Sequence, residues 1–186
     1  MPPAQKGFLN GQPTGYRVPV RTTERLRLEP ITSDHAGDLW TVHQDPAVAH
    51  WYGQWTLDMA RREASLYGAA WASGSVHKWL AYERISGKVV GRGGLSWKHV
   101  DGERRLETGW ALRGDFWGRG YASEIGRESL AYGFTLPAAD QIVAFTEKEN
   151  IRSQAVMARI GMHHLRDIVH RGSPFVLYAI DRPVII

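Results

Sequence analysis

The chain of 186 residues contains no cysteine. This absence excludes disulfides, thiolate nucleophiles and zinc sites with cysteine ligands. The eight histidines show no His-Glu-x-x-His spacing, and His163 and His164 would point to opposite faces of a strand, so no metal site is predicted. No apolar run is long enough to cross a membrane, and the first residues lack the layout of a signal peptide. We therefore expect a cytoplasmic protein with no metal and no membrane partner.

Runs of like charge are also missing. The 23 Lys and Arg residues give a formal net charge of only +4 and are scattered along the chain, which argues against a nucleic-acid partner. The hydrophobic content of 43% is sufficient for one domain with an ordinary core. A mildly basic surface would help to attract an anionic ligand.

Hydrophobic periodicity predicts a single α/β (α+β) domain over residues 21–186, preceded by a flexible N-terminal arm at residues 1–20, which is rich in Gly, Pro and polar residues. The predicted order is β-αα-βββ-α-β-α-ββ. The aromatic segment at residues 46–55 is predicted to be a loop because Asp45-Pro46 ends the first helix. The predicted strands are residues 26–29, 79–85, 88–97, 104–112, 141–146, 163–170 and 175–180, and the predicted helices are residues 33–43, 57–71, 121–134 and 150–160.

The most informative segment lies at the junction of the third hairpin strand and the next helix, residues 115–124. Gly118 and Gly120 occur there, and glycine lets a ligand approach the main chain closely. The start of a helix adds unpaired N–H groups and a positive dipole end, so the segment suits a pyrophosphate. The P-loop ending Gly-Lys-Ser/Thr is absent, and Ser123 replaces the third glycine of the dinucleotide fingerprint. On spacing alone, a glycine-rich turn without a ligand is the competing interpretation.

Four segments together give the chain a family resemblance. They are residues 45–48 (DPAV), 87–91 (GKVVG), 107–112 (ETGWAL) running into 117–124 (WGRGYASE), and 150–153 (NIRS) with 158–162 (ARIGM). With these motifs, residues 25–181 resemble the GNAT superfamily of acetyl-CoA-dependent N-acetyltransferases, and most of all its Rim-type branch, which acetylates ribosomal-protein α-amines. The resemblance implies a mixed, mostly antiparallel sheet that is splayed at the cofactor site.

Two positions depart from the family pattern. Asp115 stands where the pyrophosphate motif usually opens with Gln or Arg, which puts a side-chain contact in doubt but leaves the main-chain N–H groups. Met162 stands where many relatives place a tyrosine that protonates the departing thiolate, and methionine has no proton to donate.

The resemblance implies acetyl-CoA as cosubstrate and a set of residues that bind it. The strand before the loop would pair with the pantetheine amides and supply a main-chain donor to the thioester oxygen. The loop and helix start would bind the diphosphate. The implied residues are Ala111, Leu112, Arg113, Trp117, Gly118, Arg119, Gly120, Tyr121, Ala122 and Asn150.

The resemblance also implies two catalytic residues. Glu107 occupies a position that some members use for a general base acting through water; the alternative is a structural pair with Arg104 or Arg105. Ser153 would donate a hydrogen bond to the leaving sulfur; the alternative is a local role in the first turn of its helix. Because the chain has no cysteine to carry an acetyl group, we expect direct transfer in a ternary complex.

The acceptor side is less readable. The resemblance places His50, Trp51 and Trp55 beside a primary amine, either a protein N-terminal α-amine or a small molecule; the same aromatics would also serve as core, and for Trp40 we favour that role. An α-amine needs less help to deprotonate than lysine does, because its pKa is about 8 rather than about 10.4. A non-catalytic acyl-CoA sensor is the alternative function, and we expect a monomer or homodimer.

Overall fold

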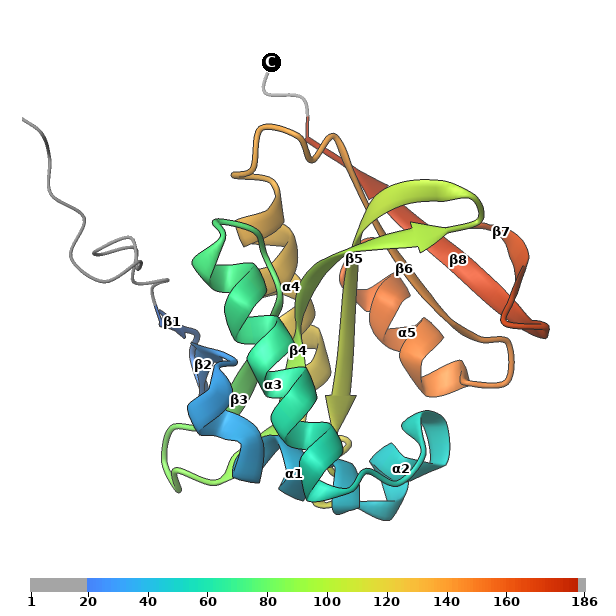
Figure 1. Cartoon of the computed structure of the whole chain (residues 1–186). Helices are drawn as coiled ribbons and strands as arrows, with labels where there is room; N and C mark the ends of the chain where they lie inside the picture. Colours follow the sequence, from blue (N-terminus) through green and yellow to red (C-terminus); the bar gives the residue numbers. More distant parts are fainter. Residues whose placement is uncertain (1–19, 184–186) are drawn as a thin grey trace, which may run out of the picture.

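A computed structural model describes residues 20–183, so the predicted arm at residues 1–20 lies, except for its last residue, outside the described part. The elements follow each other as β1 (Arg21–Thr22), β2 (Leu26–Pro30), η1 (Ser33–His35), α1 (Ala36–Gln44), α2 (Pro46–Tyr52), α3 (Leu57–Ala72), β3 (Lys78–Glu83), β4 (Val89–Val100), β5 (Glu103–Leu112), η2 (Gly114–Phe116), α4 (Tyr121–Gly133), β6 (Gln141–Glu147), α5 (Ile151–Arg159), β7 (His163–His170) and β8 (Ser173–Asp181) (Figure 1).

The eight strands of the described residues form one sheet in the order β1-β2-β3-β4-β5-β6-β8-β7. Every neighbouring pair is antiparallel except β5 and β6, which are parallel. That parallel pair is in register at two positions only, Leu106 with Ile142 and Glu107 with Val143. Beyond them the two strands separate toward their C-terminal ends, which confirms the predicted splay.

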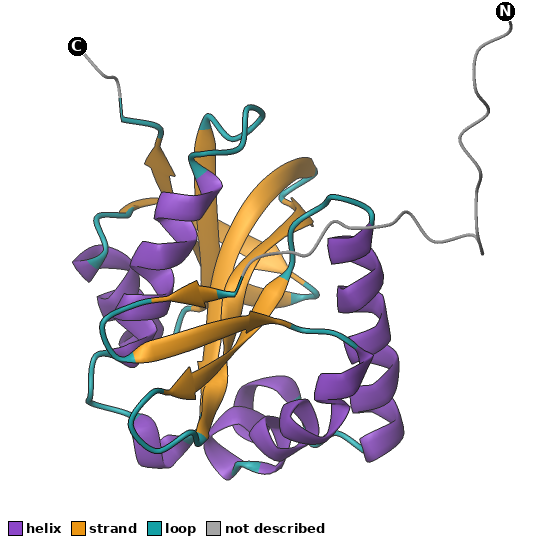
Figure 2. Cartoon of the chain, turned by 90° about the vertical axis from the view of Figure 1, so that its left-hand side faces the viewer, coloured by secondary structure: helices purple, strands orange, loops and turns teal. Residues whose placement is uncertain are grey.

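Helices cover both faces of the twisted sheet (Figure 2). Helix α4 packs against β4 and β5 on one face, and α5 packs against α4, β6 and β7. Helix α1 packs against β4 on the other face, with α3 alongside it. Because strand side chains alternate between faces, separate apolar cores form on the two faces, one containing Trp79 and Ile125 and the other containing Leu39 and Leu80. A third, smaller cluster that contains Leu177 lies at the β6–β8 end of the sheet.

The single α/β domain and the order of its main elements are confirmed. The expectation of a loop over residues 46–55 was wrong, because Pro46–Tyr52 forms helix α2. Asp45 does end α1, but its side chain also accepts a hydrogen bond from the Ala47 N–H and caps the new helix, with proline in the first turn. Asp-Pro thus stops one helix and starts another.

Glycines within β4 serve close packing. A Cβ at Gly91 would collide with the Ala111 carbonyl oxygen, and one at Gly93 would lie 2.5 Å from a methyl group of Ile125. Both positions let β5 and α4 approach β4 closely.

Candidate functional site

A loop with two glycines in left-handed conformation connects η2 to α4. The φ angles of Gly118 and Gly120 are +75° and +82°, a region that side-chain-bearing residues rarely adopt. Residues 117–120 are exposed, and Gly120 is the N-cap of α4. The loop therefore turns its main chain to the surface where the helix begins, as the sequence predicts. We call residues 117–120 the glycine loop.

Helix α4, like α1, starts without a side-chain cap, whereas α2, α3 and α5 each have one. The side chains of Asp45, Thr56 and Asn150 cap α2, α3 and α5, each by accepting a main-chain N–H. No side chain caps α4. Its first-turn N–H groups are thus left for an anionic ligand, which the helix dipole also favours.

Contacts from three directions fix the glycine loop. The Arg25 guanidinium donates to the Arg119 carbonyl oxygen at 2.8 Å and pairs with Glu124 at 2.7 Å. The Trp117 indole donates to the Leu112 carbonyl oxygen at 2.9 Å. Arg152 of α5 lies over the Trp117 ring, 4.6 Å from its centroid. The loop is therefore held between β2, β5 and α5.

The end of β5 presents main-chain groups to the gap between β5 and β6. The Arg113 N–H donates to the Val90 carbonyl oxygen at 3.0 Å. Because bonded positions alternate in an antiparallel ladder, Ala111 also faces β4, whereas the main chain of Leu112 faces away from it. The Leu112 N–H is thus the main-chain donor of this segment that points into the gap.

Glu107 lies on β5 at the last paired position before the gap and is 8% exposed. Its Oε2 accepts hydrogen bonds from Lys78 Nζ at 2.8 Å and from Ser96 Oγ at 2.9 Å. The expected structural alternative, a pair with Arg104 or Arg105, was wrong. The buried Glu107 carboxylate is paired with Lys78 because Lys78 is also buried and lies within reach.

The other oxygen of Glu107 leans over Gly109. A Cβ at Gly109 would lie 2.5 Å from Oε1 and 3.5 Å from Lys78 Nζ. Glycine at this position therefore makes room for the carboxylate, which extends along β5 toward the gap. Burial lowers the pKa of Lys78 to about 8, against the opposing effect of Glu107.

Ser153 and Asn150 lie together at the start of α5. The Asn150 side chain caps the helix by accepting the Ser153 N–H at 3.1 Å, as predicted. The Ser153 hydroxyl makes no hydrogen bond with another residue of the described range, 20–183. The Ser153 side chain is half-buried. Its hydroxyl makes no hydrogen bond to the backbone of the first turn of α5, which the alternative local role would require.

The predicted acceptor aromatics do not form one group. His50 and Trp51 contact each other edge to face at the end of α2, and His50 is exposed. Trp55 instead stacks on His43 of α1, with ring centroids 3.5 Å apart. The aromatic that reaches β5 is Tyr52, whose hydroxyl lies 3.5 Å from the Trp110 carbonyl oxygen.

Sequence reasoning missed a set of polar side chains on the face covered by α1 and α2. We call His43, Tyr52, Lys78, Arg92 and Glu107 the polar cluster. His43, Lys78, Arg92 and Glu107 are buried. Arg92 Nε donates to His43 Nε2 at 3.0 Å, and burial, reinforced by Arg92, lowers the pKa of His43 to about 3. No sequence motif joins these residues, because the pairing of β3, β4 and β5 brings them together from distant parts of the sequence.

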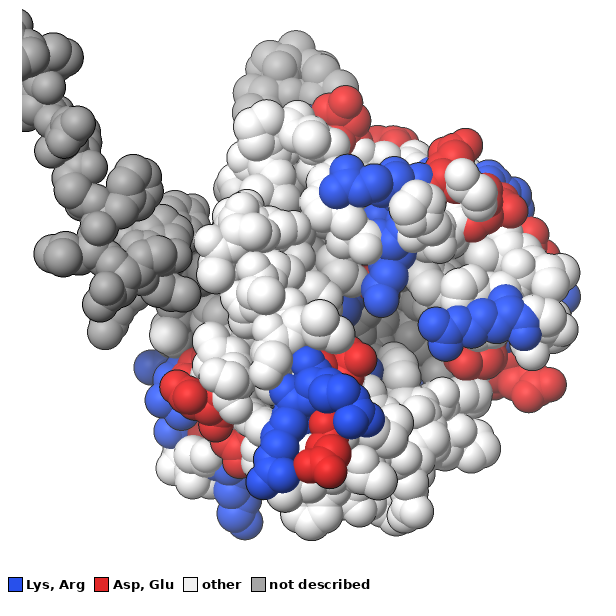
Figure 3. Space-filling model, in the orientation of Figure 1, with Lys and Arg blue, Asp and Glu red and all other residues white. Residues whose placement is uncertain are grey.

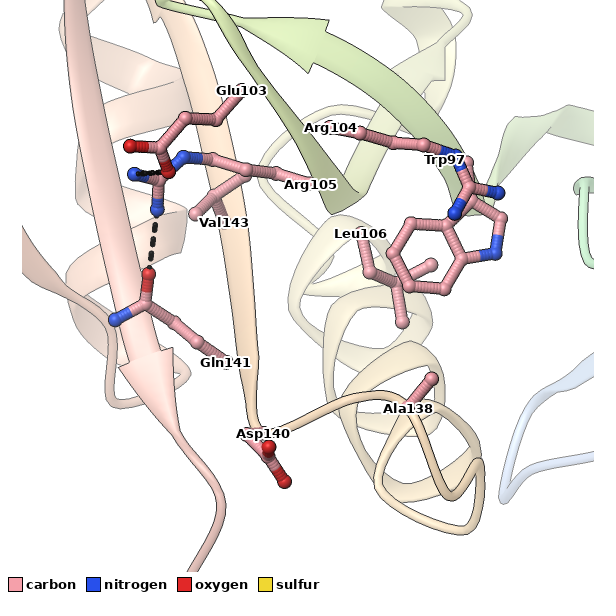
Figure 4. A pocket seen from close by; sticks show the side chains of 9 residues that line it. All are labelled: Trp97, Glu103, Arg104, Arg105, Leu106, Ala138, Asp140, Gln141 and Val143. Carbon is pink, nitrogen blue, oxygen red and sulfur yellow. Dashed lines mark hydrogen bonds and ion pairs between the residues drawn. The ribbon is translucent and has the colours of Figure 1, made fainter.

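A surface pocket of about 200 Å³ lies at the other end of the β5–β6 pair. Figure 4 shows it between Trp97, Arg104 and the start of β6, with Arg105 bonded to Glu103 and Gln141. None of the predicted site residues lines it. The face seen in Figure 1 is hollowed between β5 and α5, with Lys and Arg side chains beside the hollow (Figure 3).

Two features are absent from residues 20–183, a metal-binding group and a membrane-spanning helix. No group of three or more His, Asp or Glu side chains lies in an arrangement that could hold a metal ion. None of the helices in residues 20–183 combines the length and apolarity that a membrane span requires.

The chain is similar to known acetyltransferases. An uncharacterized N-acetyltransferase of Bacillus subtilis, YoaA, is 25% identical over 177 residues, which cover 89% of this chain and 98% of the relative. A GNAT-family acetyltransferase structure from Bordetella pertussis aligns with a TM-score of 0.77 and 21% identity over 87% of this chain and 98% of that one. A ribosomal L7/L12 α-N-protein acetyltransferase in complex with coenzyme A aligns with a TM-score of 0.71 and 14% identity, over 87% and 97%.

The sequence profile of the acetyltransferase (GNAT) domain matches residues 25–163. This range contains the gap between β5 and β6, the glycine loop and α5. The chain belongs to the GNAT acetyltransferase family.

Proposed function

We propose that the protein is an N-acetyltransferase that moves an acetyl group from acetyl-CoA to a primary amine by direct transfer in a ternary complex. One observation carries the proposal: β5 and β6 separate after two paired positions, and they do so beside an uncapped helix start that carries two left-handed glycines. The gap suits an extended pantetheine chain, and the helix start suits the diphosphate.

The coenzyme is bound mainly through main-chain groups. The glycine loop and the first turn of α4, Tyr121 and Ala122, bind the diphosphate. The segment 111–113 borders the pantetheine, and within it the Leu112 N–H donates to the thioester oxygen as negative charge develops. Asn150 contacts the pantetheine arm while it caps α5.

Acetyl-CoA supplies the activated acetyl group, and the chain supplies the proton transfers. Glu107 accepts the proton of the attacking amine through a water molecule, since its free oxygen leans toward the gap over Gly109. Lys78 and Ser96 fix the carboxylate by binding its other oxygen. Ser153 donates a hydrogen bond to the leaving sulfur with a hydroxyl that has no other partner in the described range.

The acceptor enters from the face covered by α2, where His50, Trp51 and Trp55 would border it. The relatives whose names state an acceptor include a ribosomal-protein acetyltransferase and an aminoglycoside acetyltransferase, at 14% and 17% identity. Such distant similarity supports the fold alone, so the Rim-type resemblance of the sequence motifs does not choose between these acceptors.

A non-catalytic acyl-CoA sensor is the second candidate, and two observations favour it. Met162 replaces the tyrosine of many relatives, and it is buried. The Glu107 carboxylate is already paired with Lys78, an arrangement that is also consistent with a purely structural role.

An acceptor screen separates the two functions. The purified chain is incubated with acetyl-CoA and with peptides that have free N-termini, amino acids, polyamines and aminoglycosides, and free thiol is measured. Calorimetry of acetyl-CoA binding accompanies it. Amine-dependent thiol release supports the transferase. Binding without release on any acceptor supports the sensor, and absence of binding rejects both.

A further inference from the structure

A buried arginine in the polar cluster has no counter-ion among residues 20–183. Arg92 lies in the middle of β4 and is 6% exposed. Its Nε donates to a neutral histidine, His43, and its guanidinium lies over the Tyr52 ring, 4.6 Å from the centroid. Within residues 20–183 no carboxylate forms an ion pair with it. Buried charges in proteins are normally paired, so this one indicates a missing anion.

The carboxylates on the elements that cover this face do not supply the missing charge. Glu107 is paired with Lys78 at 2.8 Å. Asp38 of α1 accepts a hydrogen bond from a tyrosine hydroxyl at 2.6 Å. Glu63 of α3 faces Tyr67 and forms no ion pair within the described range. Glu147 of β6 raises the pKa of Tyr52 from a distance but forms no ion pair with Arg92. Among residues 20–183, the polar cluster therefore carries one positive charge, on Arg92, without an ion-pair partner.

Nearby histidines are affected by this charge. Burial lowers the pKa of His43 to about 3, and Arg92 lowers it further in the same direction. Burial also lowers the pKa of His77 to about 3, with smaller contributions from Lys78, Lys98 and Arg92. Both rings stay neutral at physiological pH, so neither adds to the charge or cancels it. The site is positive because of Arg92.

Arg92 lies next to the place where the acetyl group is proposed to sit. In the β4–β5 ladder it is paired with Ala111, directly before Leu112. Glu107 is on the same face of β5 as Ala111, four residues earlier, or about 13 Å along the strand. A ligand group on Arg92 would thus lie beside the reacting carbonyl, with the proposed base further along the same strand.

Arg92 is covered by a side chain at the end of α2. Its exposed fraction is 6%, whereas Tyr52, which lies over it, is 46% exposed. A peptide N-terminus carries a neutral amide where a free amino acid carries its carboxylate, so it offers no negative charge to this guanidinium. The carboxylate of a small molecule can reach a guanidinium at this depth and bind it through two parallel hydrogen bonds.

We propose that Arg92 binds the carboxylate of the acceptor, so that the acceptor is a small amino carboxylic acid rather than a peptide N-terminus or a polyamine. This inference rests on the proposed acetyl transfer only for the claim that the amine is the reacting group. The binding of a carboxylate by Arg92 is independent of acetyl transfer.

The first test uses matched acceptors and the unmodified protein. Alanine and the other proteinogenic amino acids, together with β-alanine and γ-aminobutyrate, are each compared with their carboxamides at saturating acetyl-CoA. A charged, bidentate contact predicts that kcat/KM for the best acid exceeds that of its amide by about 10- to 150-fold. Equal use of acid and amide, or preference for a peptide, overturns the inference while leaving the transferase intact.

The second test does not need turnover. Binding of the N-acetyl amino acids and N-acetyl amino amides is measured by calorimetry in the presence of coenzyme A. Acid binding at least about 10-fold tighter than amide binding supports the inference even if no acceptor is acetylated, an outcome that would reject the proposed function alone. Equal affinities, or no binding of either, overturn it.

Two variants locate the effect. Arg92→Met is expected to remove the difference between acid and amide, and Arg92→Lys to retain only part of it because a lysine lacks the planar fork. Arg104→Met is the matched control, since Arg104 is an exposed arginine stacked on Trp97 in the neighbouring strand. Acid preference that survives in both Arg92 variants overturns the inference. The comparison of acids with amides in the unmodified protein decides the question if Arg92→Met does not fold.

Discussion

The two sides of the proposed site are built in different ways. On the coenzyme side, residues 111–122 are contiguous in sequence and contribute mainly main-chain groups and two left-handed glycines. On the acceptor side, the polar cluster combines side chains of α1, α2, β3, β4 and β5, separated by up to 64 positions between His43 and Glu107. A contiguous main-chain site is suited to a ligand that a whole family shares. An assembled side-chain site is free to vary with the acceptor.

The strongest test of this division is Glu107→Gln. Loss of the proposed base should lower kcat by about 100-fold or more, most visibly at low pH, and leave acetyl-CoA affinity unchanged. Glu103→Gln, at the exposed start of the same strand, is the control for activity. Thermal unfolding is followed in parallel, because the variant also leaves Lys78 without a charged partner. A pH–rate profile like that of the unmodified protein would remove Glu107 from the chemistry.

Gly118→Val, on the coenzyme side, should instead lower the affinity for acetyl-CoA. A side chain at this position both strains the backbone and blocks the approach of the diphosphate, so acetyl-CoA affinity should fall by about 30-fold or more in calorimetry. Gly172→Val is the matched control: its φ is +80°, and, as at Gly118, no atom lies within 4 Å of an added Cβ. The control is expected to lose stability but keep affinity. Equal affinity in the two variants contradicts a diphosphate site at the glycine loop.

Acid should destabilise the acceptor side through His43. Its pKa is about 3 in the folded protein, against an ordinary value of 6.5, so the unfolded chain binds more protons between these values. The free energy of unfolding should therefore fall as the pH falls from about 6.5 to 3. His43 contributes at most about 1.4 kcal/mol per pH unit to this slope, and His77, whose pKa is lowered in the same way, adds to it. Urea titrations across that range measure the slope, and His43→Gln should reduce it. The exposed His164→Gln is expected to leave the slope as it is.

Ser153→Ala should produce the smallest change, a reduction of kcat by about 5-fold, since one neutral hydrogen bond to the leaving group contributes about 1 kcal/mol. Coenzyme affinity and unfolding temperature should stay close to those of the unmodified protein, because Asn150 accepts the main-chain N–H of residue 153 whatever its side chain. Ser65→Ala, on the exposed surface of α3, is the control. Full activity of Ser153→Ala would assign Ser153 to the helix start only.

The difference between the two sides also explains what could be predicted from the sequence. The glycine loop and the Asn150 cap were predictable because a turn and a cap depend on neighbours within a few residues. The partner of Glu107 was not. Lys78 reaches it across β4, and that contact depends on the register of two ladders, which no local signal determines.

Helix α2 was missed for a related reason. The sequence signal was read at Asp45-Pro46 as a stop, although Asp before Pro is also a good helix start. The error mattered for the site, because α2 ends at Tyr52 and so places that ring over Arg92.

The contacts that fix the glycine loop come entirely from the protein itself, through Arg25, Trp117 and Arg152. A segment already ordered before its ligand arrives loses little conformational entropy on association. Changes outside the glycine loop, at the corner between β1 and β2 where Arg25 lies, would then weaken the proposed coenzyme binding by loosening the loop.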